Sequence, residues 1–407
     1  MTNNVKTKKV ILHIDVDSFF VSCEVALRPE LKGKEIAIAM HHANSVVVSL
    51  SYEAKAKGGK VPFSVSKVKQ SCPNLIVIEP NLSLYQNFSK KIYNLLVEHY
   101  SPIVQIVSID EWYIDATSIW KKYGSIKNLI SDIQKRMSVK LLMPVSIGVS
   151  YNKFLAKMAT AINKPLGTTI ITYNNYKKMI WEMPITNYYG LGKVRSSQLI
   201  KLGINTIGDF AACESIDPQI KKIFLNQTQK FIDNANGFGD DIVKLDNNIL
   251  SSISKEKTFI NGPAEESREV YLSLKQIAER VSERLIERNI CGSNVSISIK
   301  TREGHKSRSM QLDKLINSSD DIYLYASQLM NKFWNNEPIV CLGIKVSKVE
   351  PSFQNFMNQS LFSSKGHGEL NNIEKIIENI NSKMNNKVVM SGKEWREYSN
   401  SKQNKFR

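Results

Sequence analysis

Residues 10–20 read Val-Ile-Leu-His-Ile-Asp-Val-Asp-Ser-Phe-Phe, an apolar run that ends among carboxylates. The apolar part predicts a buried strand, which Asp15 closes. Asp17 and Ser18 are residue types that favour a helix N-cap, and the pattern after them predicts a helix over 19–27. An N-cap role would account for Asp17 without any metal ion.

The segments around this stretch differ in character along the chain. Strand and helix patterns alternate over roughly the first 170 residues, which predicts an α+β or α/β catalytic domain. Residues 174–236 are almost entirely helical in pattern. Strand and helix patterns return over 252–350 and predict a second α+β unit. The remainder, 351–407, is polar and rich in Asn, Ser and Lys, with a helix-like stretch at 373–384, and we expect it to be largely extended.

The 407 residues carry 55 basic and 38 acidic side chains, a formal net charge of +17. This length predicts about two to four domains. The positive surplus indicates a polyanionic partner, with nucleic acid ahead of an acidic membrane surface; a generally basic soluble protein is the alternative. No apolar run approaches the ~18–20 residues of a membrane span, and no signal-peptide core follows the N-terminus.

The five cysteines are scattered along the chain, at Cys23, Cys72, Cys213, Cys291 and Cys341. They form no Cys-x-x-Cys pair, so the sequence predicts neither a zinc site nor a disulfide framework. Free thiols of this kind suit a reducing cytoplasm, where we expect the protein to be located.

Carboxylates follow two predicted strands, because Asp15 ends the first and Asp110 and Glu111 follow the run 103–107. Mg²⁺ prefers such hard oxygen ligands, and a pair of ions can promote an in-line phosphoryl transfer. Consecutive side chains on a regular strand point to opposite faces. Asp110 and Glu111 therefore converge only if the chain bends, as a hairpin turn after Ser108 would allow. An acidic pair after a strand is also common surface decoration, so this pattern alone leaves both interpretations open.

Five blocks of sequence, in order and in spacing, resemble the Y-family DNA polymerases, and most closely the bacterial DinB/UmuC-like group. They read Ile-Asp-Val-Asp-Ser-Phe-Phe at 14–20, Ser-Tyr-Glu-Ala-Lys at 51–55, Ser-Ile-Asp-Glu-Trp-Tyr-Ile-Asp at 108–115, Gly-Val-Ser-Tyr-Asn-Lys-Phe-Leu-Ala-Lys at 148–157 and Asn-Lys-Pro-Leu-Gly at 163–167. The likeness runs from about residue 9 to residue 350.

The resemblance implies an α+β fold with the right-hand arrangement of a polymerase. Its parts would be a catalytic palm at 1–18 and 82–172, small fingers at 19–81, a helical thumb at 173–240, a linker at 241–252, an α/β little finger at 253–350 and a tail at 351–407. The implied activity is template-directed addition of dNTPs to a primer 3′-hydroxyl past damaged template. With short fingers and no room for an exonuclease, we expect low fidelity and low processivity.

The resemblance also implies roles for individual residues. Asp15, Asp110 and Glu111 would be catalytic and would hold two Mg²⁺ ions, with Mn²⁺ as a possible substitute, and the backbone carbonyl of Val16 would be a further ligand. The nucleotide contacts would come from Tyr52, Lys55, Lys164 and the backbone near Phe19 and Phe20. Phe20 falls at the steric gate that excludes a 2′-hydroxyl; its structural alternative is a core aromatic on a helix. Lys157 would be structural or phosphate-facing.

Two residues depart from the family pattern. Lys55 stands where the family usually has Arg, which grips phosphate bidentately, so we expect weaker orientation of the triphosphate unless Lys57 compensates. Trp112 is bulkier than the residue usual after the acidic pair. It would either crowd the primer end or pack the hairpin.

Two segments suggest how the protein holds DNA. Gly190 and Gly192, followed by a helix and Leu-Gly-Ile at 202–204, fit a helix-hairpin-helix whose backbone amides bind phosphate. Alternation over 295–302 predicts a strand with an apolar back and a basic, hydroxyl-rich front, although a solvated sheet face looks the same. The little-finger residues expected to contact DNA are Lys300, Arg302, Lys306, Arg308, Lys345, Ser347 and Lys348.

The tail carries a short stretch, Asn358, Gln359, Ser360, Leu361 and Phe362, that resembles the peptide by which bacterial polymerases dock on the β-type sliding clamp. The expected protein is a monomeric, cytoplasmic, nucleoid-associated polymerase. Two alternatives belong to other classes. One is a catalytically silent DNA- and clamp-binding scaffold, and the other is a metal-dependent nuclease.

Overall fold

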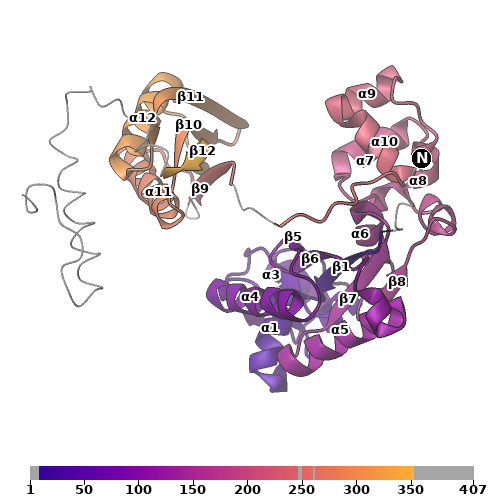
Figure 1. Ribbon diagram of the computed structural model, residues 1–407. Coiled ribbons are helices and arrows are strands. Elements are labelled where there is room, and N and C mark those ends of the chain that lie inside the picture. Colours follow the sequence, from indigo (N-terminus) through magenta and orange to yellow (C-terminus); the bar gives the residue numbers. More distant parts are fainter. Residues whose placement is uncertain (1–8, 246–249, 260–261, 353–407) are drawn as a thin grey trace, which may run out of the picture. The chain divides into compact units, whose positions relative to one another are not determined.

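The computed structural model describes residues 9–245, 250–259 and 262–352 of the chain. Clustering of contacts divides the protein into a first unit, Met1–Asn247, and a second unit, Asn248–Arg407. The division falls inside the segment 241–252 that the sequence assigns to a linker. Figure 1 shows the elements of each unit.

The first unit is built on a five-stranded sheet in the order β5-β6-β1-β7-β8. The strands are β1 (Ile11–Val16), β5 (Val104–Ile106), β6 (Glu111–Asp115), β7 (Val145–Ser150) and β8 (Thr168–Ile170). All neighbours are antiparallel except β7 and β8. β1 is central and buried at every position, because helices cover both faces of the sheet.

Three helices cover one face of this sheet and a fourth covers the other. The first three are α1 (Phe19–Leu27), α4 (Leu82–His99) and α5 (Ile126–Leu141), and the fourth is α6 (Lys153–Ile162). α6 approaches β7 closely at Gly148, where a Cβ would lie 2.2 Å from the Ala156 carbonyl oxygen. Gly148 therefore permits the contact that brings the side chains of α6 to the sheet.

A smaller three-stranded sheet, in the order β3-β2-β4, has its own core. Its strands are β2 (Ile36–Ile38), β3 (Ser49–Leu50) and β4 (Ile76–Ile78), with helices α2 (Tyr52–Ala56) and α3 (Val65–Ser71) beside it. Ser51 caps α2 by accepting from the Ala54 amide and also binds the backbone of β2, so it fixes α2 on the sheet.

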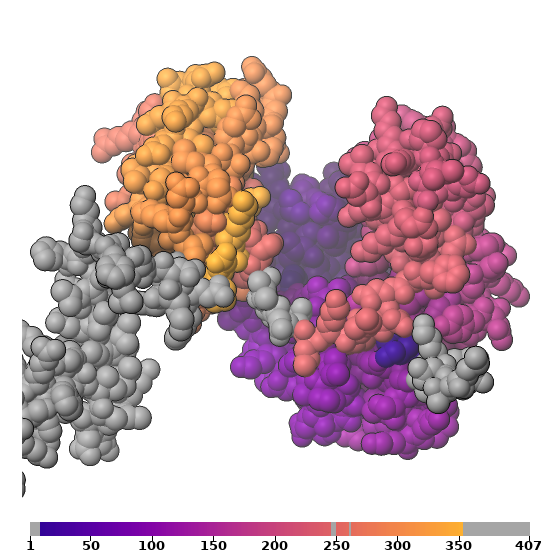
Figure 2. Space-filling model, turned by 45° about the horizontal axis from the view of Figure 1, so that its top comes forward, coloured from indigo at the N-terminus to yellow at the C-terminus, as the bar shows by residue number. Residues whose placement is uncertain are grey.

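The last part of the first unit is helical, as the sequence predicts. The helices are α7 (Lys193–Lys201), α8 (Ile207–Ala211), α9 (Pro218–Phe224) and α10 (Thr228–Ala235), preceded by a π-helical turn at Lys177–Trp181. They pack around Tyr188, Phe210 and Phe224 and form the lobe coloured rose in Figure 2. Short 3₁₀ turns lie at Pro29–Leu31, Trp120–Tyr123, Ile185–Asn187 and Leu225–Gln227.

The second unit is an antiparallel sheet with two helices on one face. The strand order is β11-β10-β12-β9, with β9 (Ser252–Thr258), β10 (Ile290–Lys300), β11 (His305–Ile316) and β12 (Cys341–Pro351). α11 (Ser267–Glu287) and α12 (Ser319–Phe333) bury the apolar back of the sheet. The α+β expectation is confirmed for both units. Across the described part of the chain, no helix has the length and apolar character needed to cross a bilayer.

Candidate active site and nucleic-acid interface

The strands β1 and β6 bring the carboxylates together. Asp15 and Glu111 are directly opposite each other in the antiparallel register, so their side chains share one face. The predicted bend is present, because the amides of Val107 and Ser108 both donate to the Glu111 carbonyl, at 2.9 and 3.4 Å. Asp110 lies in that turn, and its carboxylate accepts from the Ser108 hydroxyl at 2.6 Å.

Two lysines neutralise the pair formed by Asp15 and Glu111. Lys157, on α6, places its ammonium 2.6 Å from Glu111 Oε2 and 3.5 Å from Asp15 Oδ2. Lys164 forms an ion pair with Asp15 Oδ1. Burial raises the pKa of Asp15 against the opposing charge of the lysines. Burial acts the same way on Glu111, but hydrogen bonds from His13 and Lys157 outweigh it and lower the pKa of that carboxyl.

His13 supports Glu111 from within β1. Its Nε2 lies 3.2 Å from Glu111 Oε2, and its Nδ1 lies 2.9 Å from the hydroxyl of Thr160 on α6. The imidazole is fully buried, which lowers its pKa to about 4, so it is neutral near pH 7. His13 therefore fixes the orientation of Glu111 and joins β1 to α6. This role could not be predicted from the sequence, because a lone histidine in an apolar strand shows no sign of its partners.

The donors at this place suit a divalent cation. Asp15, Asp110 and Glu111 supply carboxylate oxygens at adjoining strand ends. The amide of Val16, the last residue of β1, donates a 3.0 Å hydrogen bond to the Asp110 carbonyl. Within the described ranges, no three acidic, imidazole or thiol groups already converge on one point as a ready metal centre. The positive charges at the carboxylates are instead lysine ammonium groups. The fit to Mg²⁺ rests on the chemistry of the donors, which are hard oxygens, and not on a preformed cluster of ligands.

Asp17 has a structural role, but not as the helix N-cap that the sequence suggests. Ser18 is the residue at the N-cap of α1, with a left-handed backbone (φ 47°) and no side-chain capping bond. The buried Asp17 carboxylate instead accepts from the Ser146 hydroxyl at 2.9 Å and from the Leu166 amide at 2.8 Å. It also accepts from the Tyr52 hydroxyl at 3.2 Å. Asp17 thus ties β7, the loop before β8 and α2 to the end of β1.

The residues expected to contact the triphosphate gather around the segment after Asp15. The Lys55 ammonium donates to the Ser18 hydroxyl at 2.8 Å and lies 4.3 Å from the centroid of the Tyr52 ring. Lys164 reaches the same segment through its ion pair with Asp15. Burial lowers the pKa of Lys55, and the neighbouring Lys164 lowers it further.

Lys57 does not replace the missing arginine at position 55. Its ammonium forms an ion pair with Glu35. Because the charge of Lys57 is paired with Glu35, the structure does not support compensation by Lys57. Lys55 remains the cation on α2 that contacts Ser18.

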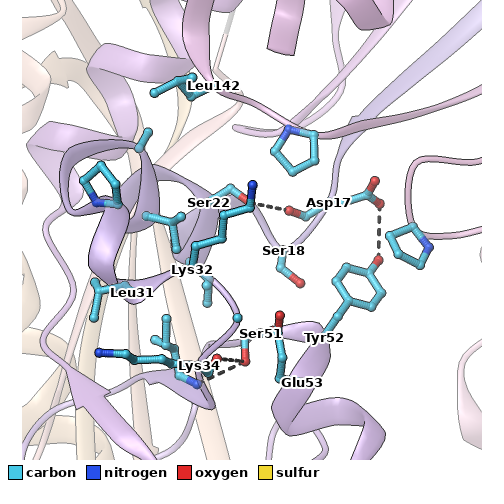
Figure 3. A pocket seen from close by; sticks show the side chains of 18 of the residues that line it. Asp17, Ser18, Ser22, Leu31, Lys32, Lys34, Ser51, Tyr52, Glu53 and Leu142 are labelled. Atoms are coloured by element: carbon cyan, nitrogen blue, oxygen red, sulfur yellow. Dashed lines mark hydrogen bonds between the residues drawn. The ribbon is translucent and has the colours of Figure 1, made fainter. Parts of the chain in front are cut away.

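A pocket of about 650 Å³ opens beside these residues. Its lining includes Asp17, Ser18, Tyr52 and Lys32, with Leu142 on another wall (Figure 3). The figure shows the Tyr52 hydroxyl pointing at the Asp17 carboxylate. The free volume therefore reaches one of the expected triphosphate contacts.

The two phenylalanines after Ser18 have different environments. Phe19 is buried in the core of the five-stranded sheet. Phe20 is half-buried and stacks on Tyr85, with ring centroids 4.4 Å apart and an interplanar angle of 17°. The Tyr85 hydroxyl donates to the buried Glu24 at 2.9 Å, which fixes the ring under Phe20. Phe20 therefore packs against the core and against Tyr85 while remaining partly exposed.

Trp112, which follows Glu111, is completely buried in the core of the sheet. Successive side chains on β6 point to opposite faces, so Trp112 points away from the side of Glu111. Of the two alternatives for this residue, packing of the hairpin is the one the structure supports.

The turn before α7, which the sequence suggests as a phosphate-binding hairpin, contains two glycines. Gly190 has φ +91°, a conformation that favours glycine, and Gly192 is the N-cap of α7. After α7, Gly203 has φ +81° and leads to the capping box that Thr206 and Asp209 form at α8. The first helix of the hairpin is thus approached by an open, glycine-rich backbone.

The open face of the second unit is rich in hydroxyl groups. Ser296 and Ser298 on β10 are opposite Ser309 and Ser307 on β11, and Lys345 on β12 is opposite Ser296. A shallow pocket runs along this face. Lys300 and Ser347 share this face, because Lys300 lies two positions after Ser298 on β10 and Ser347 lies two positions after Lys345 on β12.

Two of the expected DNA contacts do not share that face. Lys306 is opposite the buried Ile299, and Arg308 is opposite the buried Ile297. Both side chains therefore lie on the side of the helices, where Lys306 pairs with Glu337 and Arg308 stacks 4.5 Å from the centroid of the Phe333 ring. The sequence alone suggested the front face for Lys306 and Arg308, because it does not reveal the register of β11 against β10.

The remaining expected contacts are exposed but irregular. Arg302 lies in the turn between β10 and β11. Lys348 has a left-handed backbone (φ 53°), so the strand pattern does not fix the face of its side chain. The clamp-like residues Asn358, Gln359, Leu361 and Phe362 lie outside the described residues.

Comparisons with known proteins agree with this geometry. The family model described as the impB/mucB/samB family matches residues 14–161, and the model of its C-terminal domain matches residues 251–359. The chain is 33% identical over 388 residues to DNA polymerase IV 1 of Bacillus subtilis (strain 168), covering 94% of this chain and 92% of the relative. It is 32% identical over 352 residues to DNA polymerase IV of Ureaplasma parvum serovar 3, covering 86% and 96%.

Solved structures show the same fold. The Y-family DNA polymerase chimera Dbh-Dpo4-Dbh matches with a TM-score of 0.72 at 23% identity, over 84% of this chain and 99% of the other. A Dbh ternary complex matches with a TM-score of 0.58, over 83% and 98%. The order of the sequence blocks, the paired carboxylates and these similarities lead to one conclusion. The chain belongs to the impB/mucB/samB family, among the bacterial DinB-like members of the Y-family DNA polymerases.

Proposed function

We propose that this protein is a template-directed translesion DNA polymerase whose chemistry takes place at Asp15, Asp110 and Glu111. The pairing of Asp15 with Glu111 across β1 and β6 carries the proposal, because it joins carboxylates from two strands at one point. A protein that only recruits others has no need to hold like charges together. The family implies dependence on divalent metal ions in general.

In the proposed reaction the primer 3′-hydroxyl attacks the α-phosphate of a dNTP and pyrophosphate leaves. Two Mg²⁺ ions, when bound, would lower the pKa of the hydroxyl and stabilise the charge on the leaving oxygen. Asp15, Asp110 and Glu111 would hold those ions, with the carbonyl of Val16 as a further ligand. His13 keeps Glu111 oriented through its hydrogen bond, and its lowered pKa makes it a weak base near pH 7.

Contacts with the nucleotide would come from two sides. Tyr52, Lys55 and Lys164 would bind the triphosphate, with backbone amides near Phe19. Phe20 would lie under the deoxyribose, where its ring would clash with a 2′-hydroxyl. The stacking of Phe20 on Tyr85 supports this role, because a gate needs an immobile side chain.

DNA would be held by both units without reading its sequence. The backbone at Gly190 and Gly192 would bind phosphate in the first unit. In the second unit the hydroxyl-rich face would follow the phosphate backbone, with Lys300, Arg302, Lys345, Ser347 and Lys348 as the proposed contacts. The helix-side positions of Lys306 and Arg308 do not support a direct contact for these two.

We propose further that the enzyme is error-prone and poorly processive on its own, and that it works as a monomer on chromosomal DNA in the cytoplasm. The stretch Asn358–Phe362 would dock on a β-type sliding clamp, with Leu361 and Phe362 filling an apolar pocket. Docking of this kind would supply the processivity that we expect the enzyme to lack on its own.

Primer extension with purified protein, Mg²⁺ and each dNTP singly tests the proposal. The test variant is Asp110→Ala/Glu111→Ala. The control is Asp320→Ala/Asp321→Ala, which removes two consecutive acidic residues from α12 in the second unit. We expect extension only with the dNTP that the template specifies. The first variant should reduce it by about a thousandfold or more, and the control should leave it intact. Tight DNA binding with no extension by the wild type would instead support the recruitment scaffold, and dNTP-independent degradation would support a nuclease.

A further inference from the structure

The ammonium group of Lys157 contacts both carboxylates to which the proposed function assigns metal ions. It lies 2.6 Å from Glu111 Oε2 and 3.5 Å from Asp15 Oδ2. We propose that Lys157 is a resident cation: it neutralises the pair in the metal-free enzyme and turns aside when divalent ions bind, so it sets how tightly they bind. This inference rests on the proposed function only for the identity of the metal ligands.

The need for a resident cation follows from the register. Asp15 and Glu111 are opposite each other on neighbouring strands, and like charges in that arrangement repel. Water screens the repulsion poorly, because the Asp15 and Glu111 side chains are only 8% and 19% exposed. Lys157 is itself only 15% exposed and reaches both strands from α6. It therefore keeps the two carboxylates close to each other before any metal ion arrives.

The same contact makes Lys157 a competitor. Glu111 Oε2 already lies within hydrogen-bond distance of both His13 and Lys157, and a carboxylate oxygen has about two lone pairs to offer. A metal ion bound to that oxygen would meet the Lys157 ammonium directly. Because the two cations repel each other, Lys157 must weaken its contacts with Asp15 and Glu111 when a metal ion binds to these carboxylates.

The Lys157 ammonium group has an alternative partner, the aromatic ring of Tyr189. Its ammonium lies 5.6 Å from the centroid of the Tyr189 ring, within the range of a cation–π contact. Its flexible four-carbon stem allows such a change of position without moving α6. Tyr189 directly precedes Gly190 in the proposed phosphate-binding turn, so the alternative position lies beside the DNA-holding part of the same unit.

Lys153 provides a matched control on the same helix. It lies one turn before Lys157, and its ammonium pairs with Asp240 at 2.5 Å and with Gln105 at 3.2 Å, away from Asp15 and Glu111. Both lysines are about equally buried, at 14% and 15% side-chain exposure. Loss of either one removes a half-buried ion pair, but only Lys157 competes with a metal ion.

The test is a titration of the full-length protein with Mn²⁺ alone, followed by electron paramagnetic resonance, without DNA or nucleotide. We expect Lys157→Met to bind Mn²⁺ at least about fivefold more tightly than the wild type, the lower end of the usual range for coupling between sites. Lys157→Arg, which keeps the charge, and Lys153→Met should bind as the wild type does. If Lys157→Met does not fold, Lys157→Gln serves the same purpose.

Melting temperatures supply a second readout. Lys157→Met should melt at a lower temperature than the wild type in EDTA, and its gain in melting temperature on adding Mg²⁺ should be larger, because tighter binding stabilises the folded state more. Equal or weaker Mn²⁺ affinity in Lys157→Met would overturn the proposal. If Asp110→Ala/Glu111→Ala binds Mn²⁺ as well as the wild type, the assignment of the metal ligands fails instead, so the two failures are distinguishable.

Discussion

The five-stranded sheet of the first unit and the four-stranded sheet of the second present their polar residues in opposite ways. At the end of β1 and β6, Asp15 and Glu111 are largely buried and are engaged by lysines, and Glu111 also by a histidine. Along β10, β11 and β12, serines and lysines form an open face. Charged groups that are held in fixed positions away from water suit catalysis. A solvent-exposed, hydroxyl-rich face suits the binding of a polyanion that can slide along it.

The difference predicts that the two sheets respond differently to substitution. A change at the first sheet alters the orientation of reacting groups, so it should act on rate and on discrimination between substrates. A change at the second removes one of several similar contacts, so it should act mildly and in proportion to salt concentration.

The largest of these effects is expected at Phe20. Phe20→Ala removes the ring that would meet a 2′-hydroxyl, so the preference for dNTP over rNTP should fall by about tenfold or more. The ratio of kcat/KM for dCTP and rCTP opposite template guanine measures it. Tyr85→Phe keeps the stacked ring and removes only the bond to Glu24, so it should reduce the preference less than Phe20→Ala does. An unchanged ratio in Phe20→Ala would show that Phe20 is not the gate.

A smaller gain is expected from Lys55→Arg. A guanidinium can hold phosphate through two parallel hydrogen bonds where an ammonium acts as a point charge, so the KM for dNTP should fall by about two- to fivefold. Steady-state single-nucleotide insertion measures this change. Lys57→Arg is the control, because Lys57 is paired with Glu35, and its KM should stay at the wild-type value. A higher KM in Lys55→Arg would argue against a triphosphate contact at this position.

The second sheet offers a pair of lysines on opposite faces. Lys345→Ala removes a cation from the open face and should weaken DNA binding a few-fold, with the slope of log K against log salt reduced by about 0.9. Lys306→Ala removes a cation that pairs with Glu337 on the helix side, so the slope should not change. Fluorescence anisotropy at several salt concentrations separates the two. Equal slopes for both variants would contradict the face assignment.

The smallest effect concerns stability against pH. The pKa of His13 is lowered to about 4 by burial, whereas an unfolded chain titrates near 6.5. As the pH falls from about 6.5 towards 4, the unfolded chain takes up a proton that the folded chain does not, so His13 makes the wild type less stable over that window. The destabilisation caused by His13→Gln should therefore shrink as the pH falls from 7 to 5. Urea unfolding at both pH values measures it; a constant difference would mean that His13 is not buried as a neutral group.

Much of the fold was predictable where the apolar pattern is long. The helix Phe19–Leu27 matches its predicted bounds, because its apolar run spans more than two helical turns. The strands β4 and β8, of three residues each, were not predicted. Lys306 and Arg308 were assigned to the wrong face, because a shift of one residue across a turn exchanges the faces of a strand.

The candidate site was predictable in its ligands but not in their partners. Asp15, Asp110 and Glu111 follow apolar strands, so their position at strand ends can be inferred from the sequence alone. The contacts of Glu111 with His13 and Lys157 join residues 98 and 46 positions apart in the chain, on elements whose packing the sequence does not reveal. For the same reason the sequence suggested a helix-capping bond for Asp17, whereas its carboxylate accepts from Ser146 on β7.

The most direct test of the division between the two sheets is single-turnover primer extension, which yields the maximal rate of nucleotide addition and the Kd for DNA separately. The account predicts that Asp110→Ala/Glu111→Ala abolishes the rate and retains the Kd, whereas Lys345→Ala retains the rate and raises the Kd. Extension at the wild-type rate by the carboxylate variant, or a lost rate at unchanged Kd in Lys345→Ala, would contradict it.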